Sequence, residues 1–286
     1  MSVFIAASDE TVGADHRSPF MRCGFLAPEN DWSLFSEQWD IRVLAGPPRI
    51  PYLHMTEIRR REWRDEHKLT EADADRRVDE AFAVIAATPS LTPLSLGFNS
   101  GHMHDTFTKK VMLIGGAKKK IMPDYLAFPA FAHMVLYFCH MYRPDAEKVD
   151  FIVERKGEIT DHIKDFYAGL PLALESIGLP KLIPLMGEII PAGKDRAPLQ
   201  AADVLCWHTN RSRKGTLDAR GALRYEIIGN REGFRFDYAN EQITELWERS
   251  NESAGSGVSE LRQGHDDDPS SRPKGGETFD GDGDPN

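Results

Sequence analysis

Apolar runs with the composition of β-strands alternate with stretches of helical periodicity along most of the chain. The runs that predict strands are 2–8 (SVFIAAS), 20–28 (FMRCGFLAP), 52–58 (YLHMTEI), 93–100 (PLSLGFNS), 148–155 (KVDFIVER) and 182–190 (LIPLMGEII). The stretches that predict helices are 31–44, 128–142, 198–211, one with an apolar stripe of Ile163, Phe166, Leu170 and Leu174, and one that begins at Thr70 with a capping-box-like pair to Asp73. This order of elements predicts an α/β domain with a mixed sheet flanked by helices.

The composition changes near residue 250. A last helix on Ile243, Leu246 and Trp247 is predicted to close the folded domain, which would span 1–250. Residues 251–286 are rich in Gly, Ser, Asp and Pro and hold nine acids and three bases, so they carry −6 of the total charge of −10. A segment with so few apolar residues cannot bury a core, and we expect 251–286 to be a disordered acidic tail.

Targeting features are not evident in the sequence. No apolar run approaches the roughly 18 residues that a membrane span needs, and the start MSVFIAASDE lacks the basic region and cleavage site of a secretory signal. Three widely spaced cysteines, Cys23, Cys139 and Cys206, fit a reducing compartment and suggest neither a disulfide framework nor a zinc site. We therefore expect a cytoplasmic protein without a membrane partner.

Basic clusters interrupt a body that is otherwise mildly acidic. They are Arg59–Arg61, Lys118–Lys120 and the group Arg211, Arg213 and Lys214. Because local basic stripes set the field at a binding site, a nucleic-acid partner is compatible with the negative net charge. A solvated turn explains the lysine cluster equally well.

Carboxylates stand at the ends of several predicted strands. Asp9, with Glu10 beside it, follows the first strand, Glu57 ends the strand at 52–58, and Glu154 ends that at 148–155. Ligands of open α/β sheets usually bind at such ends. Any one of these acids could instead be a solvated loop residue, so the interpretation depends on all the positions together.

Asp203 is unusual because it lies in the apolar helix predicted at 198–211. If folding brings Asp9, Glu57, Glu154 and Asp203 together, the cluster repels itself unless cations neutralise it or some groups bind protons. Mg²⁺ or Mn²⁺ prefers oxygen ligands, and two such ions roughly 4 Å apart would activate water against a phosphodiester. Alternatively, Asp203 shares a solvent-facing side of its helix with Gln200 and Trp207.

Four short motifs together resemble a large family, the domain of unknown function numbered 3800. FIAASDET, YLHMTEI, VDFIVER and APLQAADVLCWHTNR are similar to its opening, its His-x-x-Glu element, its next acidic strand end and its closing Leu-Gln-x-Ala-Asp helix, in that order. The chain departs from the family at two points. Its Asp-Glu-Thr opening lacks the usual glycine directly after it, and Glu154 stands where the family often has Asp. The resemblance implies a ribonuclease-H-like fold with a metal-binding nuclease centre.

Residues carried over by this resemblance are Asp9, Glu57, Glu154 and Asp203, as metal ligands and catalytic groups of a Mg²⁺- or Mn²⁺-dependent nuclease. Glu10, His54 and Arg211 are expected as supporting groups, Arg211 near a substrate phosphate. Two alternatives stay open: a non-catalytic module of the same fold that binds nucleic acid or a protein, and a metal-dependent phosphatase with a closed pocket. His102 and His104 are better explained as residues of a loop or a substrate contact than as zinc ligands, since no third ligand has useful spacing.

Overall fold

The structure is a computed structural model that describes residues 2–11, 20–99, 101–102, 105, 111–114, 117–120, 123–242 and 244. For 111–114, 117–120 and 123–126 it describes the backbone alone. Most of the loop predicted at 11–18, His104, the last predicted helix and the tail 251–286 lie outside these residues.

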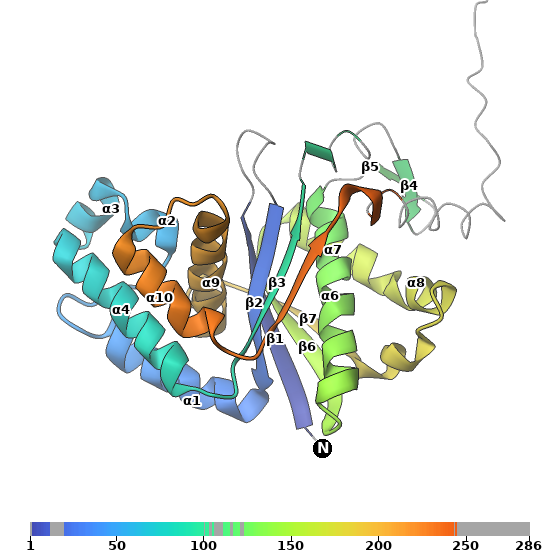
Figure 1. The fold of residues 1–286 in the computed structure, drawn as a ribbon, viewed down its shortest axis with the longest axis horizontal. Helices are drawn as coiled ribbons and strands as arrows, with labels where there is room; N and C mark the ends of the chain where they lie inside the picture. Colours follow the sequence, from blue (N-terminus) through green and yellow to red (C-terminus); the bar gives the residue numbers. More distant parts are fainter. Residues whose placement is uncertain are drawn as a thin grey trace, which may run out of the picture.

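A mixed six-stranded sheet forms the centre of the molecule (Figure 1). Its strands are β1 (Ser2–Thr11), β2 (Phe20–Pro28), β3 (Thr92–Phe98), β6 (Ala146–Glu154), β7 (Met186–Ala192) and β8 (Phe234–Tyr238). Their order is β7-β6-β1-β2-β3-β8. Strands β1, β2 and β3 are antiparallel neighbours, whereas β6 is parallel to both β1 and β7, and β8 is parallel to β3. A separate pair, β4 (Val111–Ile114) and β5 (Ala117–Lys120), is antiparallel and includes the lysine cluster.

Helices cover both faces of this sheet (Figure 1). Those on one side are α1 (Glu29–Trp39), its π-helical continuation η1 (Asp40–Leu44), α2 (Met55–Ile58), α3 (Arg61–Glu66), α4 (Glu71–Ala87), α9 (Ala197–Arg213) and α10 (Ala219–Gly229). Those on the other side are α6 (Pro123–Tyr142), α7 (Glu158–Ala168), α8 (Leu170–Ser176) and the 3-10 helix η2 (Pro180–Leu185). The α/β class with a mixed, helix-flanked sheet is therefore confirmed.

Two hydrophobic cores lie on the two faces of the sheet. One contains Trp32, Phe35 and Trp39 of α1, packed with apolar side chains of α4 and α9. The other contains Phe128 of α6 and Phe151 of β6. Alternation along the strands supplies both cores, because neighbouring side chains point to opposite faces. All three cysteines are buried and free of disulfides, and no described helix is long and apolar enough to cross a membrane.

The predicted elements at 52–58 and 182–190 need correction. Residues 52–54 belong to no regular element and 55–58 form the short helix α2, so the prediction of a strand ending at Glu57 was wrong. Strand β7 begins only at Met186, after η2. The single helix predicted around Ile163 to Leu174 is two helices that meet at Gly169. Alternating burial of Leu53 and Met55 resembles a strand in the sequence, but a short helix produces the same local pattern.

Helix α4 begins with the capping box that the sequence predicted. The Thr70 hydroxyl accepts from the Asp73 amide at 3.1 Å, and the Asp73 carboxylate accepts from the Thr70 amide at 3.0 Å. Two amide groups that have no partner within the helix are thereby satisfied.

We expect Thr70→Ala to lower the free energy of unfolding by about 1 kcal/mol, because the helix start loses its side-chain acceptor. Urea denaturation of the purified protein measures this change. Thr70→Ser keeps the hydroxyl and should be close to wild type; an equal loss in both variants would contradict the capping role.

Candidate active site: an acidic pocket between sheet and helix

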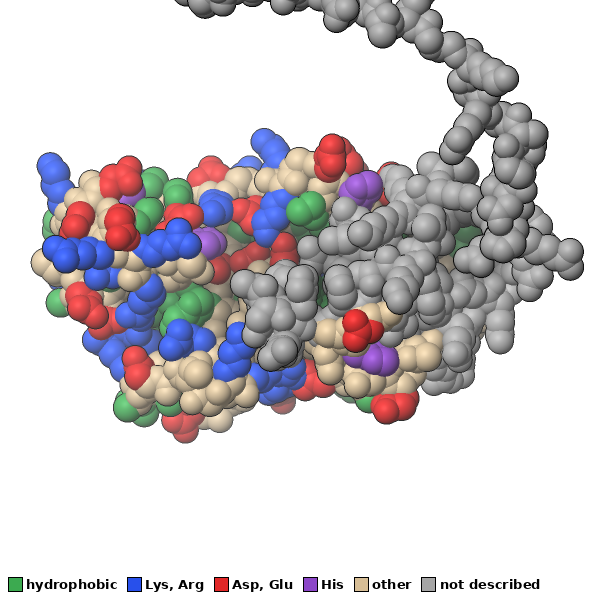
Figure 2. Space-filling model, turned by 90° about the horizontal axis from the view of Figure 1, so that it is seen from above, with side chains coloured by type: hydrophobic (Ala, Val, Ile, Leu, Met, Phe, Trp, Pro, Cys, Tyr) green, Lys and Arg blue, Asp and Glu red, His purple; other side chains and the backbone are tan. Residues whose placement is uncertain are grey.

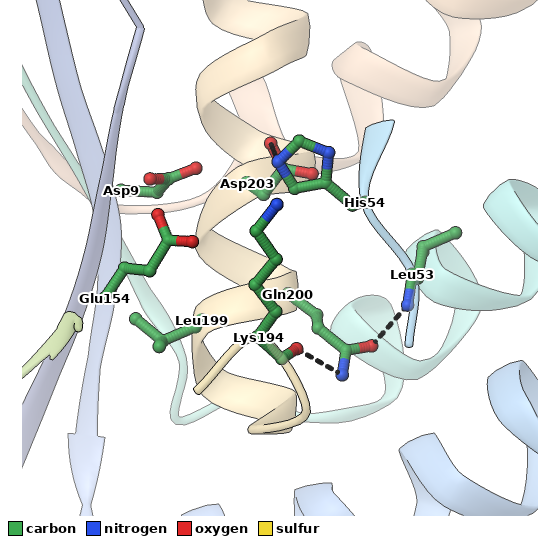
Figure 3. Close-up of a pocket in the computed structure, with 8 residues that line it drawn as sticks. All are labelled: Asp9, Leu53, His54, Glu154, Lys194, Leu199, Gln200 and Asp203. Carbon is green, nitrogen blue, oxygen red and sulfur yellow. Dashed lines mark hydrogen bonds and ion pairs between the residues drawn. The ribbon is translucent and has the colours of Figure 1, made fainter. Parts of the chain in front are cut away.

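A pocket opens between the end of the sheet and helix α9 (Figure 3). The residues that line it are Asp9, Leu53, His54, Glu154, Lys194, Leu199, Gln200 and Asp203. Figure 3 shows Asp9 and Glu154 on the sheet side, and Gln200 and Asp203 on α9. Figure 2, a view onto this end of the molecule, shows acidic side chains gathered near the middle with Lys and Arg side chains next to them.

Strand pairing places Asp9 beside Glu154. Strands β1 and β6 run parallel, with Ser8 opposite Val153, so the next residue of each strand lies at the same end of the sheet. Parallel pairing of β1 with β6 therefore brings Asp9 and Glu154 together, although 144 residues lie between them in the chain. The prediction that these two acids converge is confirmed.

Lys156 provides positive charge between these acids. Its ammonium Nζ lies 2.5 Å from Glu10, 2.8 Å from Glu154 and 3.9 Å from Asp9. Burial disfavours the charged ammonium, but the carboxylates of Glu10 and Asp9 outweigh it and raise the pKa of Lys156 above its usual range. The lysine is therefore a permanent cation at neutral pH.

Glu10, near the end of β1, is neutralised by two basic side chains, Arg22 and Lys156. The Arg22 guanidinium, which is 1% exposed, donates to it at 2.8 Å and also to the Ser8 hydroxyl at 3.1 Å. Burial opposes ionisation of Glu10, but the charges of Arg22 and Lys156 outweigh it and hold its pKa below the usual value. Glu10 therefore holds Arg22 and Lys156 at the end of β1, and its role as a supporting group stays a prediction.

Asp203 points from α9 towards the sheet. The residue is only 9% exposed, and its Oδ2 accepts a 2.6 Å hydrogen bond from the Met55 amide at the start of α2. The buried carboxylate thus serves as the acceptor that the first turn of α2 lacks in its own sequence. The alternative in which Gln200 and Asp203 face solvent is wrong, because both are buried.

Burial raises the pKa values of both Asp9 and Asp203. Desolvation, followed by the charge of Glu10, raises the pKa of Asp9 to about 6. Desolvation, followed by the charge of Asp9 and a hydrogen bond between the two carboxyl groups, raises the pKa of Asp203 well above its usual value. A protonated Asp203 that donates to Asp9 is the consistent state without another cation, since two neighbouring carboxylates resist ionising together.

His54 lines the pocket and lies between Asp203 and Glu57. The His54 Nε2 lies 4.0 Å from Asp203, and its Nδ1 lies 3.9 Å from Glu57. The chain turns into α2 after His54, which brings the imidazole close to Glu57. Burial, together with the charge of Lys194, lowers the pKa of His54, so the imidazole is neutral at pH 7.

Glu57 contacts Lys194 and Tyr52 more closely than it contacts the other acids. Lys194 Nζ lies 2.9 Å from Oε1, and the Tyr52 hydroxyl donates to Oε2 at 2.6 Å. Burial opposes ionisation, but these two hydrogen bonds lower the pKa of Glu57. Glu57 is absent from the pocket lining, so its predicted role as a ligand has weaker geometric support than that of Asp9, Glu154 or Asp203.

Gln200 joins three segments beneath the pocket. Its Oε1 accepts from the Trp39 indole and from the Leu53 amide, both at 2.8 Å, and its Nε2 donates to the Lys194 carbonyl at 3.0 Å. These bonds fix the loops that carry His54 and Lys194 relative to α9. A glutamine is suited to this position because it both accepts and donates.

Arg211 lies away from the pocket. Its guanidinium stacks over Trp207, 4.7 Å from the ring centre, and donates to the Thr216 carbonyl at 2.9 Å. It therefore does not reach the predicted phosphate position as it stands. His102 accepts or donates at 3.1 Å to Thr244, with its predicted partner His104 outside the described residues.

Sequence reasoning missed Lys156 and Lys194 and did not assign a role to Gln200. Lys156 stands two residues after Glu154, and Gln200 three residues before Asp203 on the same face of a helix. Those spacings were visible in the sequence. Lys194 lies in the loop before α9, where no periodic pattern indicates which way a side chain points.

The chemistry of the pocket suits a hard divalent cation. Its carboxylate oxygens are the ligand type that Mg²⁺ and Mn²⁺ prefer, and the buried Nδ1 of His54 lacks a hydrogen-bond partner. Among the described residues, however, no three acidic, histidine or cysteine side chains are close enough to hold an ion as they stand. An ion would therefore need small side-chain movements, such as rotation of Asp9 or Glu154.

Comparisons of the chain with protein-family models, with curated proteins and with solved structures found no match. The resemblance to the 3800 family accordingly stays a prediction.

The raised pKa values give the pocket a characteristic pH dependence. Folding raises the pKa of Asp9 from 3.8 to about 6. The contribution of Asp9 to the free energy of unfolding is therefore fully present below about pH 4 and is lost as the pH rises through 6. The side chain introduced by Asp9→Asn cannot ionise. We therefore expect the free energy of unfolding of this variant, relative to that of wild type, to increase by about 3 kcal/mol between pH 4 and pH 7 in metal-free buffer.

Asp73→Asn is the matched control for this pH series. Hydrogen bonds from Thr70 lower the pKa of Asp73, so its stabilising contribution is present above about pH 4 and lost below it, the opposite sign. Parallel pH slopes for Asp9→Asn and wild type would show that Asp9 is not destabilised by its surroundings.

Loss of the Gln200 contacts should destabilise the protein. Gln200→Leu leaves the buried Trp39 and Leu53 N–H groups without an acceptor, and we expect the free energy of unfolding to fall by about 2 to 4 kcal/mol. Gln242→Leu removes an exposed glutamine that accepts from the Ala239 amide at 2.9 Å and should change stability by less than about 0.5 kcal/mol. Equal effects in urea denaturation would contradict the role assigned to Gln200.

Proposed function

We propose that this protein is a nuclease that hydrolyses phosphodiester bonds with Mg²⁺ or Mn²⁺ and that its domain is ribonuclease-H-like. The observation that carries the proposal is the convergence of Asp9, Glu154 and Asp203 in one pocket from β1, β6 and α9. The mixed sheet supports this proposed fold: the antiparallel strands β3, β2 and β1 are followed by the parallel strands β6 and β7, and β8 lies at the other edge beside β3.

Asp9, Glu154 and Asp203 are the residues that would hold the ion, with His54 beside them. A divalent cation there would lower the pKa of a bound water and polarise the phosphodiester. The proton held between Asp203 and Asp9 would leave, since a cation favours the charged carboxylates. The raised pKa values thus describe a site in which proton and cation compete.

Lys194 would bind the anionic part of the substrate. Its ammonium group extends into the pocket between the sheet wall and His54 (Figure 3), and its side chain is 39% exposed. Glu57 orients it at 2.9 Å and, with burial opposing, raises its pKa. A charged donor at the pocket mouth suits a phosphate oxygen of nucleic acid.

A non-catalytic module of the same fold is the second candidate. It is favoured by the two lysines, which already neutralise acids of the pocket without a metal. This alternative predicts nucleic-acid or protein binding that is independent of divalent cations.

Cleavage assays with single-stranded DNA, duplex DNA, RNA and hybrid substrates test the first candidate. We expect Asp203→Asn to reduce Mn²⁺-dependent cleavage more than about 100-fold, because groups that only orient metal ligands are already worth about 10- to 100-fold. Glu188→Gln, an exposed acid on β7, should cleave like wild type. Undiminished cleavage by Asp203→Asn would remove this residue from the mechanism.

Thermal unfolding separates the two candidates. A cation that binds only the folded protein raises its apparent stability, so Mn²⁺ should increase the Tm of wild type and leave that of Asp9→Asn unchanged. The absence of a shift in wild type at millimolar Mn²⁺ would favour the binding module.

A further inference from the structure

The charges around the pocket can be counted from the contacts alone. Asp9, Glu154 and Asp203 line the pocket, and Glu10 and Glu57 are linked to it through Lys156 and Lys194. Three basic side chains of the same chain pair with members of this group: Arg22, Lys156 and Lys194. When all five acids are ionised, the state that a bound cation favours, the three basic side chains leave two negative charges unbalanced.

Lys156 differs from the other two cations in its position. Arg22 lies beneath Glu10 and is almost completely buried, and Lys194 reaches in from the exposed side to Glu57. Lys156 instead lies within ion-pair distance of three carboxylates, those of Asp9, Glu10 and Glu154. This ammonium group supplies, on the Glu154 side of Asp9, the positive charge that a cation would otherwise bring.

The neighbours of Lys156 hold it in this place. It follows Glu154 by two residues, and its amide donates to the Thr160 hydroxyl at 2.8 Å at the beginning of α7. Thr160 is buried, and its hydroxyl also lies 3.4 Å from the Glu154 carbonyl. The backbone of Lys156 is thus tied to the end of β6, and its side chain is two-thirds buried, with 32% exposed.

We propose that Lys156 is a built-in cation of the pocket and that the site takes one divalent ion, between Asp9 and Asp203, and not two. This inference rests on the proposed function and narrows it from a two-metal to a single-metal centre. One divalent ion balances the two negative charges that remain. A second ion would have to displace Lys156 from its three carboxylates, or it would add uncompensated positive charge in a partly buried site.

Metal counting by isothermal titration calorimetry with Mn²⁺ tests the inference directly, without relying on activity. We expect one ion per wild-type chain, one for Lys156→Arg and two for Lys156→Met, which removes the ammonium group but keeps the length of the side chain. Electron paramagnetic resonance supplies a second readout: an isolated Mn²⁺ spectrum for wild type, and a spin-coupled pair for Lys156→Met if two ions lie roughly 4 Å apart.

Lys148→Met is the matched control. Lys148 lies on β6, the strand that precedes Lys156, and pairs with Asp150 at 3.1 Å outside the pocket, so its replacement should leave the count at one. Circular dichroism of each variant checks that it is folded.

The outcomes separate this inference from the proposed function. Two ions per wild-type chain would overturn the single-metal assignment and leave the nuclease proposal standing, whatever the behaviour of the variants. No Mn²⁺ binding by wild type at millimolar concentration would overturn the proposed function and this inference together. A folded Lys156→Met protein that still binds one ion would show that Lys156 does not occupy the second position.

Discussion

The buried carboxylate of Asp203 connects the parts of this molecule on which its chemistry depends. It lies at the interface of α9 and the sheet, accepts the Met55 amide at 2.6 Å and shares a hydrogen bond with Asp9. A buried carboxyl group is unfavourable unless its hydrogen bonds replace those it made with water. The start of α2, the end of β1 and the middle of α9 are therefore placed by the same polar contact.

Charge compensation explains how five acids tolerate one another in this region. Arg22, Lys156 and Lys194 contact Glu10, Glu154 and Glu57, while burial and neighbouring carboxylates raise the pKa values of Asp9 and Asp203. The sequence had suggested that a metal ion is needed to relieve the repulsion, and the ion pairs show that the chain relieves much of it internally. What remains is concentrated on Asp9 and Asp203, the pair most sensitive to pH and to an added cation.

The residues of the pocket come from regular elements and from loops. Asp9, Glu154 and Asp203 project from regular elements whose side chains pack in the two cores. His54 and Lys194 project from loops, which Gln200 ties to α9 through three buried hydrogen bonds. Loops held by a rigid scaffold are the usual place for groups that must meet a substrate. In the proposed function, β1, β6 and α9 would hold the ion and the loops would contact the substrate.

The sequence by itself determined the α/β class, the boundaries of β2, the capping box of α4 and the acids worth testing, because hydrophobic period, capping residues and strand ends are local features. Only the tertiary structure decided that Asp9, Glu154 and Asp203 meet, that 55–58 is a helix and that Arg211 turns away. Strand order and the packing of α9 across the sheet set those distances, and the cations Lys156 and Lys194 acquire a role only through contacts with residues far away in the chain. Such long-range pairing leaves no periodic pattern in one sequence, which is why the charge balance of the pocket became visible only in three dimensions.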